Sequence, residues 1–210
     1  MKLGLDTLRD PTQVLATWKK LVEKPFGKQL FSRAIGLMAP YTGTISPQVI
    51  ELGPGHARVQ MRDRWGVRNH LKSVHAVALM NLGEAVTGLA AMSLVPAGGR
   101  GIVLGLAMEY VKKARGTITA ESRAELPTAP GSHDVDVRGE LKNSIGEVVA
   151  RVHARWRVEI PGLAVGERPV EAQPAPAAPA TEAAAGGADV PDEGEAARAA
   201  APAADVRDEG

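Results

Sequence analysis

The sequence contains no cysteine among its 210 residues, which excludes disulfide bonds, thiolate metal ligands and a cysteine nucleophile. A secreted domain framed by disulfides is therefore excluded as well. Aromatic residues make up only 3% of the chain and the basic residues are scattered, so nucleic-acid binding is not expected. The first ten residues lack the apolar core of a signal peptide, and we expect a cytoplasmic protein.

Several common kinds of site have no counterpart in the sequence. The five histidines show no metal-ligand spacing, and there is neither a Ser-His-Asp set nor a phosphate-binding glycine loop. We therefore expect no metal and no cofactor. His56, His133 and His153 are assigned no role, and His70 is interpreted as a loop residue.

The charge is unevenly distributed along the chain. Residues 161–210 carry three basic and ten acidic side chains, which leaves 22 basic and 14 acidic side chains in residues 1–160. The net charge of +8 in this first part favours anionic ligands. Residues 171–210 hold 16 alanines with many prolines, glycines and acids and no aromatic residue. Such a composition cannot bury enough apolar surface to fold, so 163–210 is predicted to be a disordered tail.

One long apolar stretch dominates the remainder of the chain. From Val74 to Val95 only five polar residues interrupt it, and a helix that is apolar on every side is typical of a protein interior. A membrane span is the alternative. Glu84 near the middle and the helix-weakening Gly83, Thr87 and Gly88 argue against that alternative, because an unpaired carboxylate at a bilayer centre is costly.

Helices are expected before this stretch and strands on both sides of it. An amphipathic helix is predicted at 11–22, with Val14, Leu15, Trp18, Leu21 and Val22 inward, and a second at 26–38, with Phe26, Leu30, Phe31, Ala34 and Leu37 inward. A first strand is predicted at 45–52, where Pro47 would restrict it to an edge of a sheet. Apolar residues then recur with a period of two in the segments 56–62, 104–110, 117–126, 135–141 and 148–160. This alternation predicts a half-buried antiparallel sheet.

The predicted class is α+β, with the long helix buried against one face of a strongly curved sheet. We divide the chain into N-terminal helices at 1–40, a domain at 41–162 and the tail at 163–210.

A resemblance to a known family rests on spaced residues. Asn69, His75 six residues later, Leu82, Glu84 and Gly88 resemble the motif of hotdog-fold thioesterases of the phenylacetate-pathway type. The segments GLAMEYVKKARGTITAESRAEL and SIGEVVARVHARWRV are similar to strands of the same family. The resemblance covers about residues 40–160 and implies a hotdog fold, in which a curved antiparallel sheet wraps around a long central helix. An uncharacterised subgroup fits best, because the family's His-Gly-Gly is His75-Ala76-Val77 here.

The resemblance implies an acyl-CoA thioesterase. Glu84 would be the general base or the nucleophile, and the backbone N–H groups of Ala76 and Val77 would polarise the thioester carbonyl. His75 and Asn69 would contact the substrate or the attacking water. Further substrate-binding candidates are Thr87 beside Glu84 and the basic cluster Lys112, Lys113 and Arg115, for the phosphates of coenzyme A.

Each candidate also has a structural interpretation. Glu84 could form an ion pair across a dimer interface, His75 could cap the helix, and Asn69 could form a turn. Asn81, on the same helix, is expected to be structural. The basic cluster could be an ordinary solvated turn.

The spacing of His75 and Glu84 predicts an oligomer. Nine residues of helix separate them by about 13.5 Å and place them on opposite faces, so one helix cannot direct both at one small group. If both serve one site, a second copy of the chain must supply the other half, as a dimer or a dimer of dimers.

A non-catalytic protein that binds acyl-CoA or an acyl-carrier protein is the alternative function. A hydratase on the same fold is a third possibility, although its usual Asp/His pair is missing.

Overall fold

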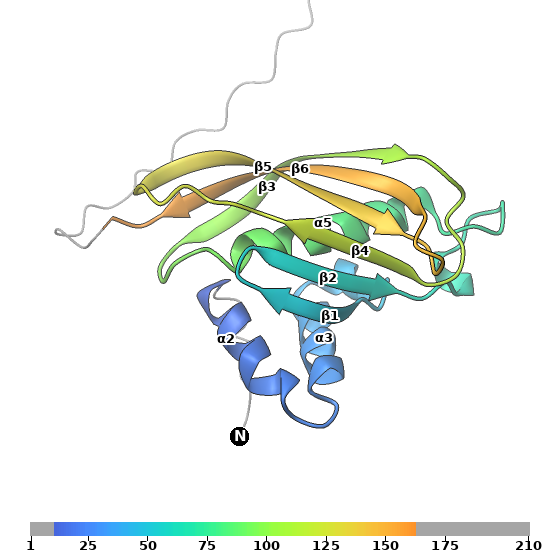
Figure 1. The fold of residues 1–210 in the computed structure, drawn as a ribbon, viewed down its shortest axis with the longest axis horizontal. Coiled ribbons are helices and arrows are strands. Elements are labelled where there is room, and N and C mark those ends of the chain that lie inside the picture. The colour runs from blue at the N-terminus through green and yellow to red at the C-terminus, as the bar shows by residue number, and fades with distance from the viewer. Residues whose placement is uncertain (1–10, 163–210) are drawn as a thin grey trace, which may run out of the picture. The chain divides into compact units, whose positions relative to one another are not determined.

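The computed structural model of the protein describes residues 11–162 (Figure 1). Its elements follow one another in the order α2 (Pro11–Val22), α3 (Gly27–Met38), α4 (Pro40–Gly43), β1 (Gln48–Gly53), β2 (His56–Met61), the 3-10 turn η1 (Trp65–Val67), α5 (Ala76–Met92), β3 (Arg100–Tyr110), β4 (Ile118–Arg123), β5 (Gly131–Lys142) and β6 (Val148–Ile160). The predicted order of helices and strands is thus confirmed, with the short α4 and η1 as additions. The predicted tail at 163–210 lies outside the described residues.

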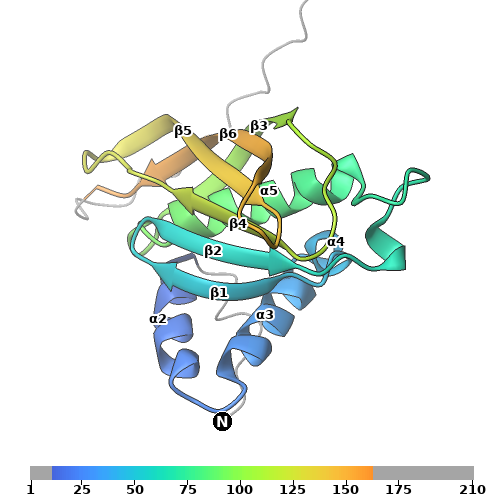
Figure 2. The ribbon, with the colours of Figure 1, turned by 45° about the vertical axis from the view of Figure 1, so that its right-hand side comes forward.

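The strands form one six-stranded antiparallel sheet in the order β1-β2-β4-β5-β6-β3. The sheet curves, and α5 lies in its concave face, where it packs against all six strands (Figures 1 and 2). The expected α+β arrangement, a curved sheet wrapped around one long helix, is confirmed.

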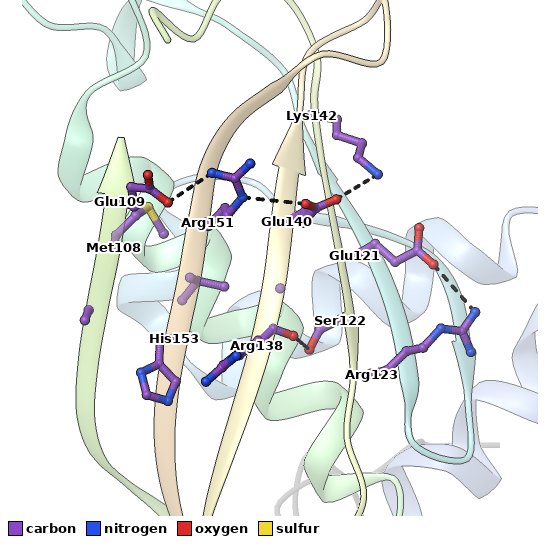
Figure 3. Close-up of a pocket in the computed structure, with 13 residues that line it drawn as sticks. Met108, Glu109, Glu121, Ser122, Arg123, Arg138, Glu140, Lys142, Arg151 and His153 are labelled. Atoms are coloured by element: carbon purple, nitrogen blue, oxygen red, sulfur yellow. Dashed lines mark hydrogen bonds and ion pairs between the residues drawn. The ribbon is translucent and has the colours of Figure 1, made fainter. Parts of the chain in front are cut away.

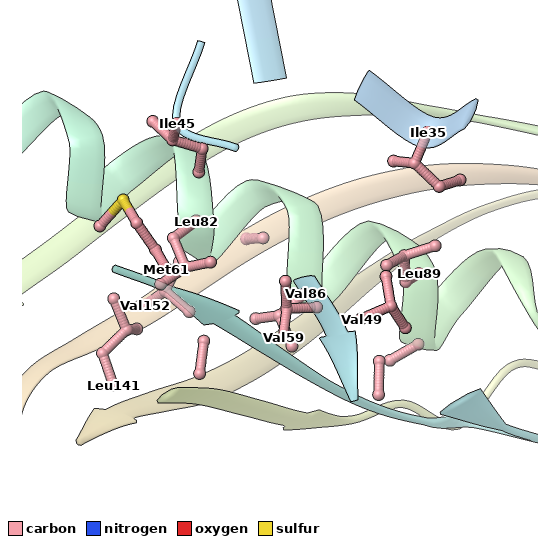
Figure 4. Packing of buried hydrophobic residues seen from close by; sticks show 14 of the residues in the cluster. Ile35, Ile45, Val49, Val59, Met61, Leu82, Val86, Leu89, Leu141 and Val152 are labelled. Carbon is pink, nitrogen blue, oxygen red and sulfur yellow. The ribbon is translucent and has the colours of Figure 1, made fainter. Parts of the chain in front are cut away.

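The core lies between α5 and the inward faces of the strands. Leu82 and Val86 of α5 are fully buried and pack with Val59 and Met61 of β2 and Leu141 of β5 (Figure 4). The polar residues between these strand positions face outward, as the period of two predicts. Burying each such side chain stabilises the fold by about 1.5–3 kcal/mol, so the core fixes α5 within the sheet.

Two glycines let α5 lie close to the sheet. A Cβ atom on Gly83 would lie 2.9 Å from Val152 Cγ2, and one on Gly88 would lie 3.0 Å from the Trp156 ring. These residues weaken the helix in isolation but allow close packing inside the sheet. In the described part of the chain, no helix is both long enough and apolar enough to span a bilayer.

The two N-terminal helices pack beside β1. The prediction for α2 is confirmed: Val14, Trp18 and Leu21 are buried, and Trp18 makes an edge contact with the ring of Phe31 of α3 at 5.2 Å between centroids. Leu15 and Val22 are partly buried against the same core.

The inward face predicted for α3 was wrong in part. Phe31 is buried, but Phe26, Leu30 and Leu37 are 80%, 53% and 68% exposed, and Ile35 takes the inward position instead. Phe26 precedes the helix in a left-handed conformation with φ 59°, which the sequence pattern does not reveal. The helix is also rotated so that a polar residue, Ser32, faces β1.

The two edges of the sheet differ. At β1, Ser32 Oγ accepts a hydrogen bond from Val49 N at 2.8 Å, and Lys28 Nζ donates to Ile50 O at 2.9 Å, so α3 occupies backbone groups of this edge. At the opposite edge, β3 exposes Ile102 and Leu104, which are 62% and 44% accessible. A β-bulge between Val103 and Gly105 shifts the alternation here, and both apolar side chains therefore face solvent in the single chain.

Candidate active site at the start of the buried helix

The N-terminus of α5 is held by His75. This residue is extended, with φ −65° and ψ 141°, and its Nδ1 accepts a hydrogen bond from Val77 N at 3.1 Å. Its own N–H donates to Val67 O at 2.8 Å, which ties the helix start to η1. The expected helix cap is therefore present.

This cap changes the prediction for the backbone donors. Val77 N–H is occupied by His75, whereas Ala76 N–H has no hydrogen-bond partner among residues 11–162. The positive end of the helix dipole lies at this position. Ala76 N–H is thus the donor that remains for a developing oxyanion.

Asn69 organises the loop that leads into α5. Its Oδ1 accepts from Leu71 N at 3.0 Å and from Ser73 N at 3.2 Å, so the turn-forming interpretation is correct for this atom. Its Nδ2 donates no hydrogen bond within the described part of the chain. Only this amide nitrogen could therefore contact a substrate.

Glu84 lies on the only side of α5 that is open. The helix is buried at most positions, but Val77 is 50% exposed and Met80 and Glu84, which follow on the same face, are half-buried. The Glu84 carboxylate makes no ion pair or hydrogen bond within residues 11–162. A carboxylate on an apolar helix without a partner among residues 11–162 points to a function or to a partner outside this part of the chain.

Thr87 does not reach this open face. It is fully buried, and its hydroxyl donates to the backbone carbonyls of Gly83, at 2.9 Å, and Glu84, at 3.1 Å. The hydroxyl satisfies the helix backbone instead of holding the Glu84 carboxylate. Asn81 is structural as expected, because its Nδ2 donates to Tyr41 O at 3.0 Å.

Two hollows flank the first turn of α5. One, of about 320 Å³, is lined by Asn69, Ala76, Leu79, Tyr110 and Lys113, among others. The other, of about 340 Å³, lies on the opposite side of the helix, where His75 and Val77 meet η1 and α4. Asn69 and Ala76 therefore face one space, and His75 faces the other.

Sequence reasoning missed Tyr110 as part of this region. Its hydroxyl donates to Ala76 O at 3.1 Å, which connects the end of β3 to the helix start, and burial raises the pKa of its phenol. The alternation in β3 indicated an inward tyrosine, but nothing in the sequence indicated which carbonyl it would meet.

The three members of the basic cluster differ in their surroundings. Lys112 Nζ is 2.7 Å from Glu147 Oε1 and lowers the pKa of that carboxyl through a hydrogen bond. Lys113 and Arg115 are exposed and form no ion pair within the described residues. Lys113 and Arg115 are therefore the better candidates for an anion.

A larger hollow, of about 780 Å³, lies elsewhere, on the outer face of β3 to β6. Charged side chains line it, and a row of ion pairs crosses it from Glu109 through Arg151 and Glu140 to Lys142 (Figure 3). Exposed pairs of this kind are typical of a solvated sheet face. None of the motif residues lies there.

Two of the histidines that were assigned no role are paired with carboxylates. His56 Nε2 lies 3.0 Å from Glu121, and His153 Nε2 lies 3.0 Å from Asp136, so both have carboxylate partners on neighbouring strands. Among the described residues no three histidine or carboxylate groups converge as metal ligands would.

Comparison with known proteins agrees with this description. Residues 27–158 match the model of a family described as a domain of unknown function, DUF4442. The chain belongs to the DUF4442 family. No protein of curated function matches it.

Several solved structures are similar to this chain, and the names of two of them state a function. A structural-genomics protein whose name states no function is 32% identical, with a TM-score of 0.61 over 71% of this chain and 97% of that one. A Pseudomonas aeruginosa protein described as a probable thioesterase is 23% identical, with a TM-score of 0.56 over 62% and 95%. A Haemophilus influenzae thioesterase is 12% identical, with a TM-score of 0.55 over 64% and 92%. The DUF4442 chain therefore has the hotdog fold, as the resemblance of its motif residues implied.

Proposed function

We propose that the DUF4442 chain is a thioester hydrolase that acts on acyl-CoA. The observation that carries the proposal is the unpartnered carboxylate of Glu84 on the open face of a helix whose N-terminus offers a free N–H. The names of the thioesterase neighbours support the same class of reaction. The catalytic roles of the individual residues are proposed from the geometry of the site together with the motif resemblance.

The thioester carbonyl lies at the start of α5. Ala76 N–H donates to the carbonyl oxygen and, together with the helix dipole, stabilises the negative charge that develops when water attacks the carbonyl carbon. His75 positions this N–H by capping the helix. Asn69 Nδ2 orients the substrate or the attacking water.

Glu84 acts as the general base. It takes a proton from the water that forms the new C–O bond, and the C–S bond then breaks, so that the thiolate of the carrier leaves and takes up a proton. Because Glu84 lies about 12 Å along the helix from Ala76, the base for each site comes from the partner protomer.

The open edge of the sheet is where we propose that two copies of the chain meet. β3 exposes Ile102 and Leu104 on unpaired backbone, and Val77 and Met80 are uncovered on the adjacent helix. Pairing two β3 edges would cover these apolar groups and bring Glu84 of each protomer toward the other helix. Lys113 and Arg115 then lie where the phosphates of the carrier can be bound.

The Glu84→Gln variant tests the proposal. Hydrolysis of an acyl-CoA should fall by about 10² or more, since the substitution removes the base and keeps the shape. The melting temperature should stay the same, because the carboxylate makes no ion pair within the described residues. Glu109→Gln, which changes an exposed carboxylate on the outer sheet face, is the matched control and should retain full turnover.

Two results would contradict the mechanism. Full hydrolysis by well-folded Glu84→Gln would exclude Glu84 as the base. A loss of dimer and a lower melting temperature would instead show that Glu84 is half of an ion pair between protomers. If the native protein binds acyl-CoA and releases no thiol, it is the non-catalytic binding protein that the fold also permits.

A further inference from the structure

An exposed tryptophan lies beside the candidate site. Trp65, the first residue of η1, is 91% exposed, whereas Trp18 and Trp156 are 5% and 7% exposed in the core. Its side chain is outside the hydrophobic core, so it does not serve the packing of its own chain. A large aromatic group presented to solvent is typical of a binding surface.

The turn that presents Trp65 is held in place on both sides. Asp63 Oδ1 accepts from Arg68 Nε at 2.6 Å, and Asp63 Oδ2 accepts from Gly116 N at 3.0 Å. Arg64 bonds to Thr44 O on the other side. The loop is therefore pre-organised, and little conformational entropy would be lost when it binds a ligand.

Positive charge surrounds the tryptophan. The loop 62–72 and the turn 112–116 lie side by side, because Asp63 bonds to Gly116 and Val74 N donates to Ala114 O at 2.8 Å. Together they form what we term the basic loop surface, with Trp65 at η1 and the exposed cations Arg62, Arg64, Arg68, Lys72, Lys112, Lys113 and Arg115. Its one acidic residue, Asp63, is 7% exposed and already paired.

The surface adjoins the start of α5. Val67 is two positions after Trp65, a span of at most about 7 Å, and Val67 O accepts the N–H of His75. Figure 2 shows this segment, in teal, projecting from the molecule beside the first turn of α5. A ligand that extends away from the thioester position therefore meets an aromatic face and several cations.

We infer that the basic loop surface binds a phosphorylated purine nucleotide, with the base stacked on Trp65 and the phosphates on the neighbouring arginine and lysine side chains. Stacking on an aromatic face and charge-assisted bonds to phosphate are the two interactions that such a nucleotide offers. The inference rests on the proposed function, because it assigns this nucleotide to the end of coenzyme A that lies far from the thioester. Trp65 is then a determinant of carrier specificity and takes no part in the chemical step.

A pair of thioesters with the same acyl group tests this assignment, one on coenzyme A and one on pantetheine, which lacks the nucleotide. Trp65→Leu should lower kcat/KM for the coenzyme A thioester by roughly 10- to 100-fold, mainly through KM, and leave the pantetheine thioester unchanged. Trp65→Phe keeps an aromatic face and should recover most of the loss. Ile145→Ala, at another exposed apolar position, is the matched control.

Binding of adenosine 3′,5′-bisphosphate provides a readout without catalysis. Because Trp65 is the exposed tryptophan of the three, titration with this probe should quench its fluorescence, and Trp65→Phe should lose the response. Arg62→Gln should weaken the binding about 3- to 10-fold, and added salt should weaken it further, whereas Arg155→Gln on the outer sheet face should not.

Three outcomes would overturn the assignment. An equal effect of Trp65→Leu on both thioesters would show a structural role. The absence of quenching at millimolar probe would exclude a nucleotide site. Quenching by vesicles that contain an anionic phospholipid, or by an acidic acyl-carrier protein, but not by the nucleotide, would assign the surface to that partner. If the nucleotide binds and neither thioester is hydrolysed, the proposed function fails and the nucleotide site stands.

Discussion

The Nδ1 atom of His75 accepts a hydrogen bond from the N–H of Val77 at 3.1 Å. This bond caps the first turn of α5 and, within the described residues, leaves the N–H of Ala76 as the free backbone donor. His75→Ala should lower the free energy of unfolding by about 1 kcal/mol, because a capping acceptor is lost. His75→Asn should keep that stability, since asparagine is a good cap, and it should also keep most of the turnover. Chemical denaturation and a thiol-release assay measure the two quantities. A stable but inactive His75→Asn would show that the imidazole itself contacts the substrate.

Removal of the Ala76 N–H is possible without breaking the helix. Ala76 is the first helical residue, where proline is tolerated, and the extended conformation of His75 is one that a following proline permits. Ala76→Pro should reduce hydrolysis by roughly 10²-fold, the usual effect of losing an oxyanion donor, with the fold intact by circular dichroism. Ala76→Gly, which keeps the N–H, is the control and should stay active.

The same variant tests whether two protomers share one site. A hybrid of an Ala76→Pro chain and a Glu84→Gln chain contains one site with both groups intact. After the two inactive proteins are unfolded and refolded together, activity should return to about a quarter of the native value, since random pairing gives half hybrid dimers with one working site each. Refolded mixtures that stay inactive would show that each chain supplies its own base.

The edge of β3 should control assembly. Ile102→Lys places a charge on the exposed apolar edge and should convert the dimer to monomer by light scattering, with loss of hydrolysis in the same concentration range. Ile145→Lys, at a position that is 78% exposed on the β5–β6 turn, should leave the dimer unchanged. An Ile102→Lys protein that remains dimeric and active would place the interface elsewhere.

Stability should depend on pH through Asp63. Its hydrogen bond to Arg68, with the hydrogen bond from Gly116 N in support, lowers the pKa of the carboxyl below the ordinary 3.8. A lowered folded pKa contributes stability that is present above the unfolded pKa and is lost as the pH falls through the folded pKa. The free energy of unfolding of the native protein should therefore fall more steeply below about pH 4 than that of Asp63→Asn. Equal slopes for the two proteins would contradict this.

Much of the fold follows from local patterns. Ala57, Val59 and Met61 alternate in the sequence and are all buried, and the long, mostly apolar stretch after Val74 is the buried helix. The position of β1 at an edge of the sheet agrees with Pro47, which directly precedes the strand and lacks the N–H that a central strand requires. These features depend on neighbours within a few residues, so the sequence contains them directly.

The side-chain partners of the site were harder to predict. A hydroxyl such as that of Thr87 can turn to its own backbone or to a ligand, and only the completed helix shows that it bonds to Gly83 O. Trp65 lies in a segment that reads only as a loop, and its exposure depends on how Asp63 holds that loop against a turn more than fifty residues away. Contacts of this length are set by the whole fold, so the sequence pattern alone could not show them.

The cover that α3 places over β1 has a consequence for how far self-association can proceed. A sheet with two bare edges can add copies at both ends and grow into a fibre. Here Ser32 and Lys28 bond to backbone groups of the β1 edge. Within the described part of the chain, β3 is therefore the edge that is open to pairing with another strand. When two such chains join through β3, each outer edge is a β1 strand that α3 partly covers, and this cover opposes further growth by strand pairing.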